Sequence, residues 1–412
     1  MKKQWLRVPA LLLAVVIAFA GSVSVLAQDD AELSGSLLLW HGWTGAEADT
    51  LNDEVLPAWE AANPGVTIET LAVPFDQLRN KFETESATGG GPDLLIGPVD
   101  WVGGLATAEL IQPLDDLVDP AALENYLPST LEALTFNDQL YGLPESFETV
   151  ALYYNKTLVP EPPTTTTELE EISAAITAEN PDVYGFALLS NFYHPAGYLF
   201  GFGGQLFDEN NMSALNSPET VDFLTWLQGF NEKPGFFQQN DDAGISSLFK
   251  EGRAAMVVNG PWASGDYAGT LGAENIGVAP LPAITENGDD PPAPFLGVKH
   301  IMINWNADEE QAALAAEFAT WFTGPESASL LAAGAGHLPA NTQVDVSGDP
   351  IASAFVEQAE NATALPLIPE MGQVWEPAGN MITTVLSGDA PPDEAAAAAA
   401  EAINSGIEQM ES

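Results

Sequence analysis

Tryptophan and aspartate side chains stand where several apolar runs end and polar or glycine-containing loops begin. Trp43 follows the apolar run 36–40, Asp100 follows another short run, and Trp262 follows Gly260-Pro261, a pair that turns the chain sharply. In α/β proteins, loops at strand ends are common ligand sites. Indole rings pack on C–H faces, and carboxylates and amides hydrogen-bond to hydroxyls. This pattern therefore favours an uncharged polyhydroxylated ligand.

The composition excludes several other classes of function. The chain has no cysteine, so disulfides, thiolate metal sites, a cysteine nucleophile and a lipid-modified cysteine anchor are excluded. It has 10 basic and 59 acidic residues, and three of the basic ones lie in the first seven positions. Without those three the formal charge is −52. Such a field repels nucleic acid and anionic lipid and disfavours phosphorylated ligands, so neither nucleic acid nor a membrane surface is an expected partner.

The N-terminus has the pattern of an export signal. Its basic start is followed by the apolar stretch 11–20 and by Val25-Leu26-Ala27, which offers small residues for cleavage. The alternative is a transmembrane anchor, but the apolar run is short for a bilayer. We therefore expect residues 1–27 to be a cleaved signal peptide and 28–35 an acidic tether. The mature protein is expected to be soluble, in the periplasm or at the extracellular face.

The elements that position these residues alternate between strand and helix. Short apolar or alternating runs predict strands, and apolar residues at helical spacing predict helices, in the order 36–40, 47–62, 66–71, 75–86, 93–96 and 102–110. This rhythm predicts an α/β layer with a mostly parallel sheet.

The second half of the chain repeats the pattern after a change near residue 141. The stretch 141–154 is rich in strand formers, Thr167 is the predicted cap of a helix over 168–178, and a second α/β set follows to about residue 280. A proline-rich linker at 291–294 precedes a strand at 295–303 and a helix at 308–323. A chain of 412 residues also exceeds one ordinary core, which indicates two domains.

Several motifs occur together in one order along the chain. They are Leu39-Trp40-His41-Gly42, Trp59-Glu60-Ala61-Ala62-Asn63-Pro64-Gly65-Val66, Gly91-Pro92-Asp93-Leu94, Tyr141-Gly142-Leu143-Pro144, Leu152-Tyr153-Tyr154-Asn155-Lys156, Ala255-Met256 with Gly260-Pro261-Trp262, and Ile368-Pro369-Glu370-Met371 ahead of Trp375. Any one motif is weak, but their shared order and spacing is specific. From about Ser36 to Gln409 the chain resembles the extracellular solute-binding proteins of the family that includes maltose-binding protein.

The resemblance implies a periplasmic-binding-protein-like α/β fold of two lobes with a multi-stranded hinge and a ligand cleft between them. The first lobe would combine 36–147 with 295–341, and the second 148–294 with 342–412. It implies a substrate-binding component of an ABC importer that closes on a neutral di- or oligosaccharide such as maltose or maltodextrin. The expected partners are this carbohydrate and a membrane permease. We expect a monomer without enzymatic activity, catalytic residues, cofactor or metal site.

In the first lobe, the resemblance assigns sugar binding to Asp100, whose alternative role is the N-cap of the following helix. Trp43 and Thr44 lie in the loop after the first strand, and for Trp43 the alternative is a core aromatic. The maltose-binding branch has a tryptophan where this chain has Gly97. Trp101 or Trp43 would then supply the missing stacking surface.

In the second lobe and the hinge, the resemblance assigns further contacts to Glu148, Asn191, Tyr193, His194, Trp262 and Trp375. Glu145 is a rival of Glu148, since two extra residues precede Glu148 here, and core packing is the alternative for Tyr193. His194 alone could suggest metal or acid–base work. However, the chain has only 4 histidines and no carboxylate–histidine spacing typical of a metal site.

Three other readings remain open from the sequence. A secreted glycosidase would use the same kind of cleft with two opposed carboxylates. A binding protein for another solute, such as a polyol or a peptide, would share the fold. A purely structural surface protein would leave the loop tryptophans without a role.

Overall fold

The computed structural model describes residues 33–288 and 290–410. The predicted signal peptide, 1–27, and most of the predicted tether lie outside this part of the chain. Across the described residues, none of the helices combines the length and the apolar character needed to cross a membrane.

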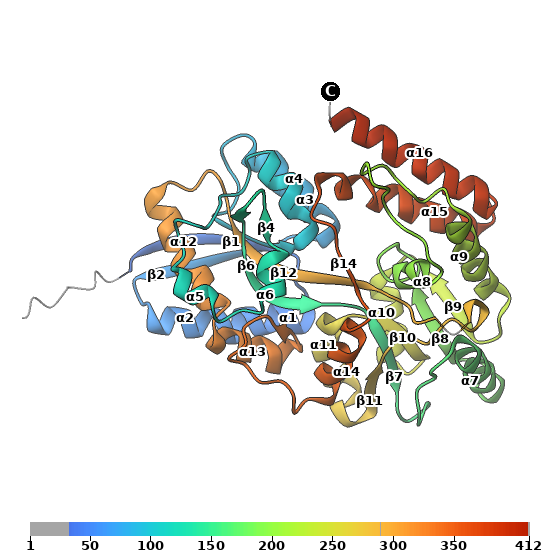
Figure 1. Cartoon of the computed structure of the whole chain (residues 1–412). Helices are drawn as coiled ribbons and strands as arrows, with labels where there is room; N and C mark the ends of the chain where they lie inside the picture. The colour runs from blue at the N-terminus through green and yellow to red at the C-terminus, as the bar shows by residue number, and fades with distance from the viewer. Residues whose placement is uncertain (1–32, 289, 411–412) are drawn as a thin grey trace, which may run out of the picture. The chain divides into compact units, whose positions relative to one another are not determined.

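A seven-stranded sheet forms the framework of the first lobe (Figure 1). Its strand order is β13-β6-β12-β3-β1-β2, with β14 paired to β12. The bounds are β1 (Gly35–His41), β2 (Val66–Ala72), β3 (Leu94–Pro98), β6 (Leu143–Glu148), β12 (Phe295–Ile303), β13 (Leu338–Pro339) and β14 (Thr363–Ala364). The helical segments associated with it are α1 (Gly45–Thr50), a π-helical turn (Leu51–Val55), α2 (Leu56–Ala62), α3 (Phe75–Ser86), α4 (Val102–Thr107), α5 (Pro120–Leu123), α6 (Pro128–Glu132), α12 (Glu309–Phe322) and α13 (Pro325–Ala335). The small hairpin of β4 (Thr135–Phe136) and β5 (Gln139–Leu140) precedes β6.

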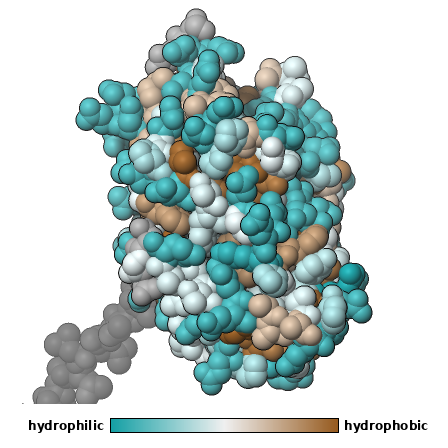
Figure 2. All heavy atoms as spheres, turned by 90° about the vertical axis from the view of Figure 1, so that its right-hand side faces the viewer, coloured by the Kyte–Doolittle hydropathy of each residue, from teal (hydrophilic) through white to brown (hydrophobic). Residues whose placement is uncertain are grey.

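A five-stranded sheet forms the framework of the second lobe, in the order β11-β7-β10-β8-β9. Its strands are β7 (Ala151–Asn155), β8 (Tyr184–Leu189), β9 (Phe236–Gln239), β10 (Ala254–Asn259) and β11 (Ile276–Ala279). Its helices are α7 (Thr166–Glu179), α8 (Ala196–Gly201), α9 (Pro218–Gly229), α10 (Asp242–Lys250), α11 (Ser264–Leu271), α14 (Pro350–Ala359), α15 (Trp375–Ser387) and α16 (Pro392–Met410). Figure 2 shows that one face of the molecule is mostly hydrophilic with small scattered apolar areas, as the acidic composition suggests.

The prediction of a mostly parallel sheet is confirmed for the strands β1, β2 and β3 on which it was based, but both complete sheets are mixed. In the first sheet β1 pairs in parallel with β2 and β3, but β12 runs antiparallel to β3 and β6, and β13 runs antiparallel to β6. In the second sheet β7 runs antiparallel to β10 and β11. The reason lies in the hinge, because β6 leaves the first sheet into β7 and β12 returns after β11. As a result, β12 runs against both of its neighbours, β3 and β6.

The chain passes between the two lobes several times, among them through β6 to β7, from β11 to β12, and from β13 to α14, which packs on β11 and β7. In addition, β14 pairs in parallel with the start of β12. Several crossings of this kind let a hinge bend without unravelling.

The cap of α7 differs from the prediction. Thr165, and not Thr167, is the N-cap, because its hydroxyl oxygen accepts a hydrogen bond from the Glu168 backbone N–H at 3.2 Å. The Glu168 carboxylate in turn accepts hydrogen bonds from the backbone and the hydroxyl of Thr164, both at 2.8 Å. This reciprocal pattern resembles a capping box and sets the first turn two residues earlier than predicted.

The loop that leads into β3, and so toward Asp100, is fixed by Asn304. Its side-chain amide donates to the Pro92 carbonyl at 2.8 Å and to the Ser86 hydroxyl at 3.1 Å. Gly91 has a φ of +92°, and a Cβ there would lie 2.9 Å from the same amide nitrogen. Glycine is therefore required for this close approach.

Candidate ligand-binding site

Asp100 lies in the single 3-10 turn Val99–Trp101 that follows β3, and only 3% of it is exposed. Trp375, the first residue of α15, donates its indole N–H to the Asp100 Oδ2 at 2.9 Å. Burial raises the pKa of Asp100 to about 6, while the indole hydrogen bond and the charge of Arg79 act in the opposite direction. The contact joins a residue after β3 of the first sheet to the first residue of α15, a helix that packs on α9 and α16.

Aromatic rings surround this contact. The Tyr193 ring centroid lies 6.2 Å from those of both Trp262 and Trp375, and the Tyr193 ring stacks on Phe295 at 5.8 Å. Trp262 stands in the 3-10 turn Pro261–Ala263 after β10, and Phe295 begins β12. The Tyr193 hydroxyl is buried and has no hydrogen-bond partner among the described residues. A buried hydroxyl without a partner is costly, so this group is suited to bind a ligand atom.

Lys299 and Glu148 form a largely buried ion pair beside these rings. The Lys299 Nζ lies 3.4 Å from the Glu148 Oε2 and 5.7 Å from the Trp262 ring centroid. Burial opposes the charge of Lys299, but Glu148, Glu47 and Glu145 outweigh it and raise the lysine pKa. Sequence reasoning missed Lys299. Its signal was a lysine inside an apolar strand of a chain with few basic residues.

Trp101 fills the space above Gly97. A Cβ at Gly97 would lie 2.6 Å from the Trp101 ring, and Trp101 is only 5% exposed. The ring stacks on Phe75, with 5.7 Å between centroids and 28° between planes. This placement agrees with Trp101 as the replacement for a tryptophan at position 97, which stays a prediction.

Trp43 is buried, whereas its neighbour Thr44 is exposed. Trp43 is 3% exposed, stacks on Phe322 at 6.1 Å and meets His337 edge-on at 5.1 Å. These are the contacts expected of a core aromatic, and ligand binding by Trp43 stays a prediction. Thr44 is exposed at the N-cap of α1, where its side chain makes no capping hydrogen bond.

Glu145, the rival of Glu148, belongs to a buried cluster with His337 and Glu47. The His337 Nδ1 lies 2.9 Å from the Glu145 Oε1, and its Nε2 lies 3.0 Å from the Glu47 Oε1. Because carboxylates only accept, both ring nitrogens donate and the ring is an imidazolium. Burial alone would lower the pKa of His337, but Glu145 and Glu47 raise it to about 10. The sequence offered no signal for this cluster beyond a single histidine.

Asn191 positions His194. The Asn191 Oδ1 accepts hydrogen bonds from the His194 backbone N–H at 3.0 Å and from its Nδ1 at 2.9 Å. Burial lowers the pKa of His194 to about 4, so its ring is neutral at physiological pH. The ring lies edge-on to Trp262 at 6.4 Å. The structure therefore brings His194 to the aromatic group and gives Asn191 a supporting position.

The two lobes also touch at a second place, between α1 and α11. The Ala46 backbone N–H donates to the Asp266 Oδ1 at 3.0 Å. Gly45 has a φ of +54°, and a Cβ there would lie 2.6 Å from the Asp266 carboxylate. A Cβ at Gly265 would lie 2.8 Å from that of Ala46. The small residues allow the two helices to approach closely.

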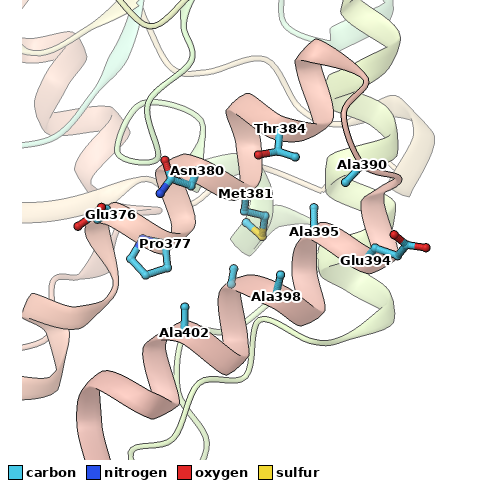
Figure 3. Close-up of a pocket in the computed structure, with 11 residues that line it drawn as sticks. Glu376, Pro377, Asn380, Met381, Thr384, Ala390, Glu394, Ala395, Ala398 and Ala402 are labelled. Carbon is cyan, nitrogen blue, oxygen red and sulfur yellow. The ribbon is translucent and has the colours of Figure 1, made fainter. Parts of the chain in front are cut away.

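A hollow of about 540 Å³ lies elsewhere, between α15 and α16 (Figure 3). Met381, Asn380 and Thr384 of α15 line it together with alanines of α16, among them Ala395, Ala398 and Ala402 (Figure 3). It has no aromatic lining and contains none of the predicted site residues. It therefore lacks the stacking surface that a sugar needs.

Two α/β lobes joined by several crossings, with aromatic rings and carboxylates contributed from both, define a solute-binding receptor. The family of bacterial extracellular solute-binding proteins matches residues 54–364, and the chain belongs to this family. Maltotriose-binding protein of Pyrococcus abyssi (strain GE5 / Orsay) is 32% identical over 360 residues, which cover 86% of this chain and 78% of the relative.

Solved structures agree with this assignment. Thermus thermophilus maltotriose binding protein bound with maltotriose is 28% identical with a TM-score of 0.82, covering 90% of this chain and 100% of that one. The maltose/maltodextrin-binding domain MalE of Bdellovibrio bacteriovorus, bound to maltotriose, is 26% identical with a TM-score of 0.84, covering 91% and 100%. The predicted two-lobe fold and the resemblance to maltose-binding protein are confirmed. By name, these relatives are binding proteins and not enzymes.

Proposed function

We propose that this chain is the exported substrate-binding component of an ABC importer, and that it binds a neutral oligosaccharide of the maltose series without chemical change. The observation that carries the proposal is the group of Asp100, Trp375, Tyr193 and Trp262, which come from both lobes and combine stacking surfaces with a carboxylate and a free hydroxyl. The names of the relatives support the maltose series.

In this mechanism each side chain has a distinct role. Asp100 accepts hydrogen bonds from sugar hydroxyls, and its charge makes those bonds stronger than neutral ones. Trp262 and Trp375 stack on pyranose faces, and the Tyr193 hydroxyl gains a partner. Because the groups belong to different lobes, a bound sugar stabilises the closed arrangement over an open one. The closed protein then docks as a monomer on a permease, which takes up the sugar.

Trp262→Ala is expected to weaken binding of maltotriose at least tenfold, about 1.4 kcal/mol, because one stacking surface is lost. Titration calorimetry measures the change. Trp305→Ala is the matched control, since Trp305 is 47% exposed after the end of β12 and lies outside the aromatic group. Equal affinities for Trp262→Ala and wild type would remove Trp262 from the site.

The same samples test the glycosidase reading. Product analysis after long incubation with maltodextrins should recover the sugars intact. Release of shorter products by the purified protein, with loss of release in Asp100→Asn, would replace the transport proposal by an enzymatic one. Binding of a polyol or peptide in place of the sugars would favour another solute.

Asp266→Ala is expected to weaken binding of every ligand that induces closure by about fivefold, about 1 kcal/mol, because the hydrogen bond to Ala46 is made between the lobes. The loss should be the same for maltose and maltotriose, since Asp266 would not touch the sugar. Thr270→Ala on the same helix is the control, because its hydroxyl bonds only the Asp266 carbonyl. A loss that varies with sugar length would contradict a role in closure.

A further inference from the structure

Phe75 is an aromatic side chain that the proposed site does not yet use. It is 54% exposed, a high fraction for a large apolar residue, and it begins α3 directly after Pro74. An exposed phenylalanine gives up part of the stabilisation that its burial would provide. Single exposed apolar residues need no explanation on their own, so the surroundings of the ring decide whether it has a role.

The ring is held in place on one side. It stacks on Trp101, which is buried beside Asp100, with 28° between the ring planes. Gly42 allows the Phe75 ring to lie close to the backbone, because a Cβ there would be only 3.1 Å from the Phe75 Cδ2. Phe75 is therefore the outer member of a two-ring stack whose inner member, Trp101, directly follows Asp100 in the chain. A ring fixed in this way loses little entropy when a ligand stacks on it.

Phe75 also lies close to the rest of the site. The Lys299 Nζ is 6.0 Å from the Phe75 centroid and 5.7 Å from the Trp262 centroid, so the same ammonium group is near both rings. Phe75 belongs to the first lobe and Trp262 to the second, and no contact joins the two rings. The arrangement leaves two separate stacking surfaces, one half-buried and one largely exposed.

We infer that Phe75 forms an outer stacking subsite for an additional sugar unit, and that the chain therefore prefers oligosaccharides longer than a disaccharide. The inference rests on the proposed function and names the ligand length within it. The inner units contact Asp100, Trp262 and Trp375, and the added unit stacks on the exposed face of Phe75.

The test compares Phe75→Ala, Phe75→Tyr and wild type with maltose, maltotriose and maltotetraose by titration calorimetry. Phe75→Ala should weaken binding of the longest sugar about fivefold and leave maltose within about twofold, whereas Phe75→Tyr should keep the wild-type preference. Trp305→Ala, which removes another exposed aromatic side chain, should change neither the affinity for the longest sugar nor the affinity for maltose. Thermal melting of each variant verifies that it is folded.

Three results would overturn the inference. Equal losses for all three sugars would mean that Phe75 acts only by holding Trp101 and Asp100. If Phe75→Ala has the same affinities as wild type, the Phe75 ring does not contact the sugar. Wild-type protein that binds none of the three sugars would contradict the proposed function and the inference together, whereas wild-type binding without a length-dependent loss contradicts the inference alone.

Discussion

His337→Leu is expected to lower the free energy of unfolding by about 4 kcal/mol at neutral pH, because it leaves two buried carboxylates without their counter-charge. Glu145 is fully buried, the Glu47 side chain is 11% exposed, and the imidazolium is hydrogen-bonded to both. Lys299 is the other charged group that interacts with both carboxylates, and the Glu148 ion pair already engages it. Chemical denaturation of the two proteins measures the difference.

The pH dependence gives this prediction a second readout. The folded-state pKa of His337 is raised from 6.5 to about 10. Its stabilising contribution is therefore fully present below about pH 6.5 and is lost as the pH rises through about 10. The gap between wild type and His337→Leu should narrow over that range. A gap that stays constant with pH would mean that the variant disturbs packing and not charge.

A double variant separates the two causes further. Glu145→Leu combined with His337→Leu removes one of the buried carboxylates together with its partner, so it should recover part of the stability lost in His337→Leu. If the double variant loses as much stability as the two single variants together, the ionic explanation is contradicted.

Asp100→Asn is expected to act in opposite directions on stability and on binding. Because burial raises the pKa of Asp100 from 3.8 to about 6, ionising this group opposes folding. The wild type should lose about 3 kcal/mol of stability, relative to the variant, as the pH rises from about 4 through about 6. Asparagine keeps an oxygen for the Trp375 indole but is a weaker acceptor than a carboxylate. Sugar affinity should therefore fall about tenfold.

Denaturation at several pH values and calorimetry at neutral pH test both parts. Asp76→Asn, which makes the same change in net charge at an exposed position of α3, should alter neither quantity. A variant that is no more stable than wild type at neutral pH would show that Asp100 is better solvated than its burial indicates.

Elements with strong local signals could be predicted from the sequence. The helix over 75–86 and the strand over 295–303 have the predicted bounds, because Leu78 and Phe82 recur at helical spacing before a run of glycines and because a proline-rich segment precedes the strand. Partners that are distant in sequence could not be predicted. The antiparallel pairing of β12 depends on where β6 leaves the sheet, which no local pattern records.

The residues of the candidate site also fall into those that the sequence could predict and those that it could not. Asp100, Trp262 and Trp375 could be proposed because motifs identify them, and the structure brings them to one place. Phe75 and the Glu47–His337–Glu145 cluster were missed because no local pattern marks them, and Lys299 was missed although a lysine inside an apolar strand is unusual in a chain with few basic residues. Only the fold reveals that residues 290 positions apart, Glu47 and His337, share a hydrogen bond.

The position of β12 has a consequence for how the protein is made. This strand lies between β3 and β6, yet it leaves the ribosome only after nearly 300 residues have been synthesised. Until then the nascent chain lacks the strand that joins the two halves of its first sheet, and such non-local pairing is slow to form. A chain whose first sheet cannot close until β12 has been made stays incompletely folded until late in translation, a state that export of the kind proposed above would require.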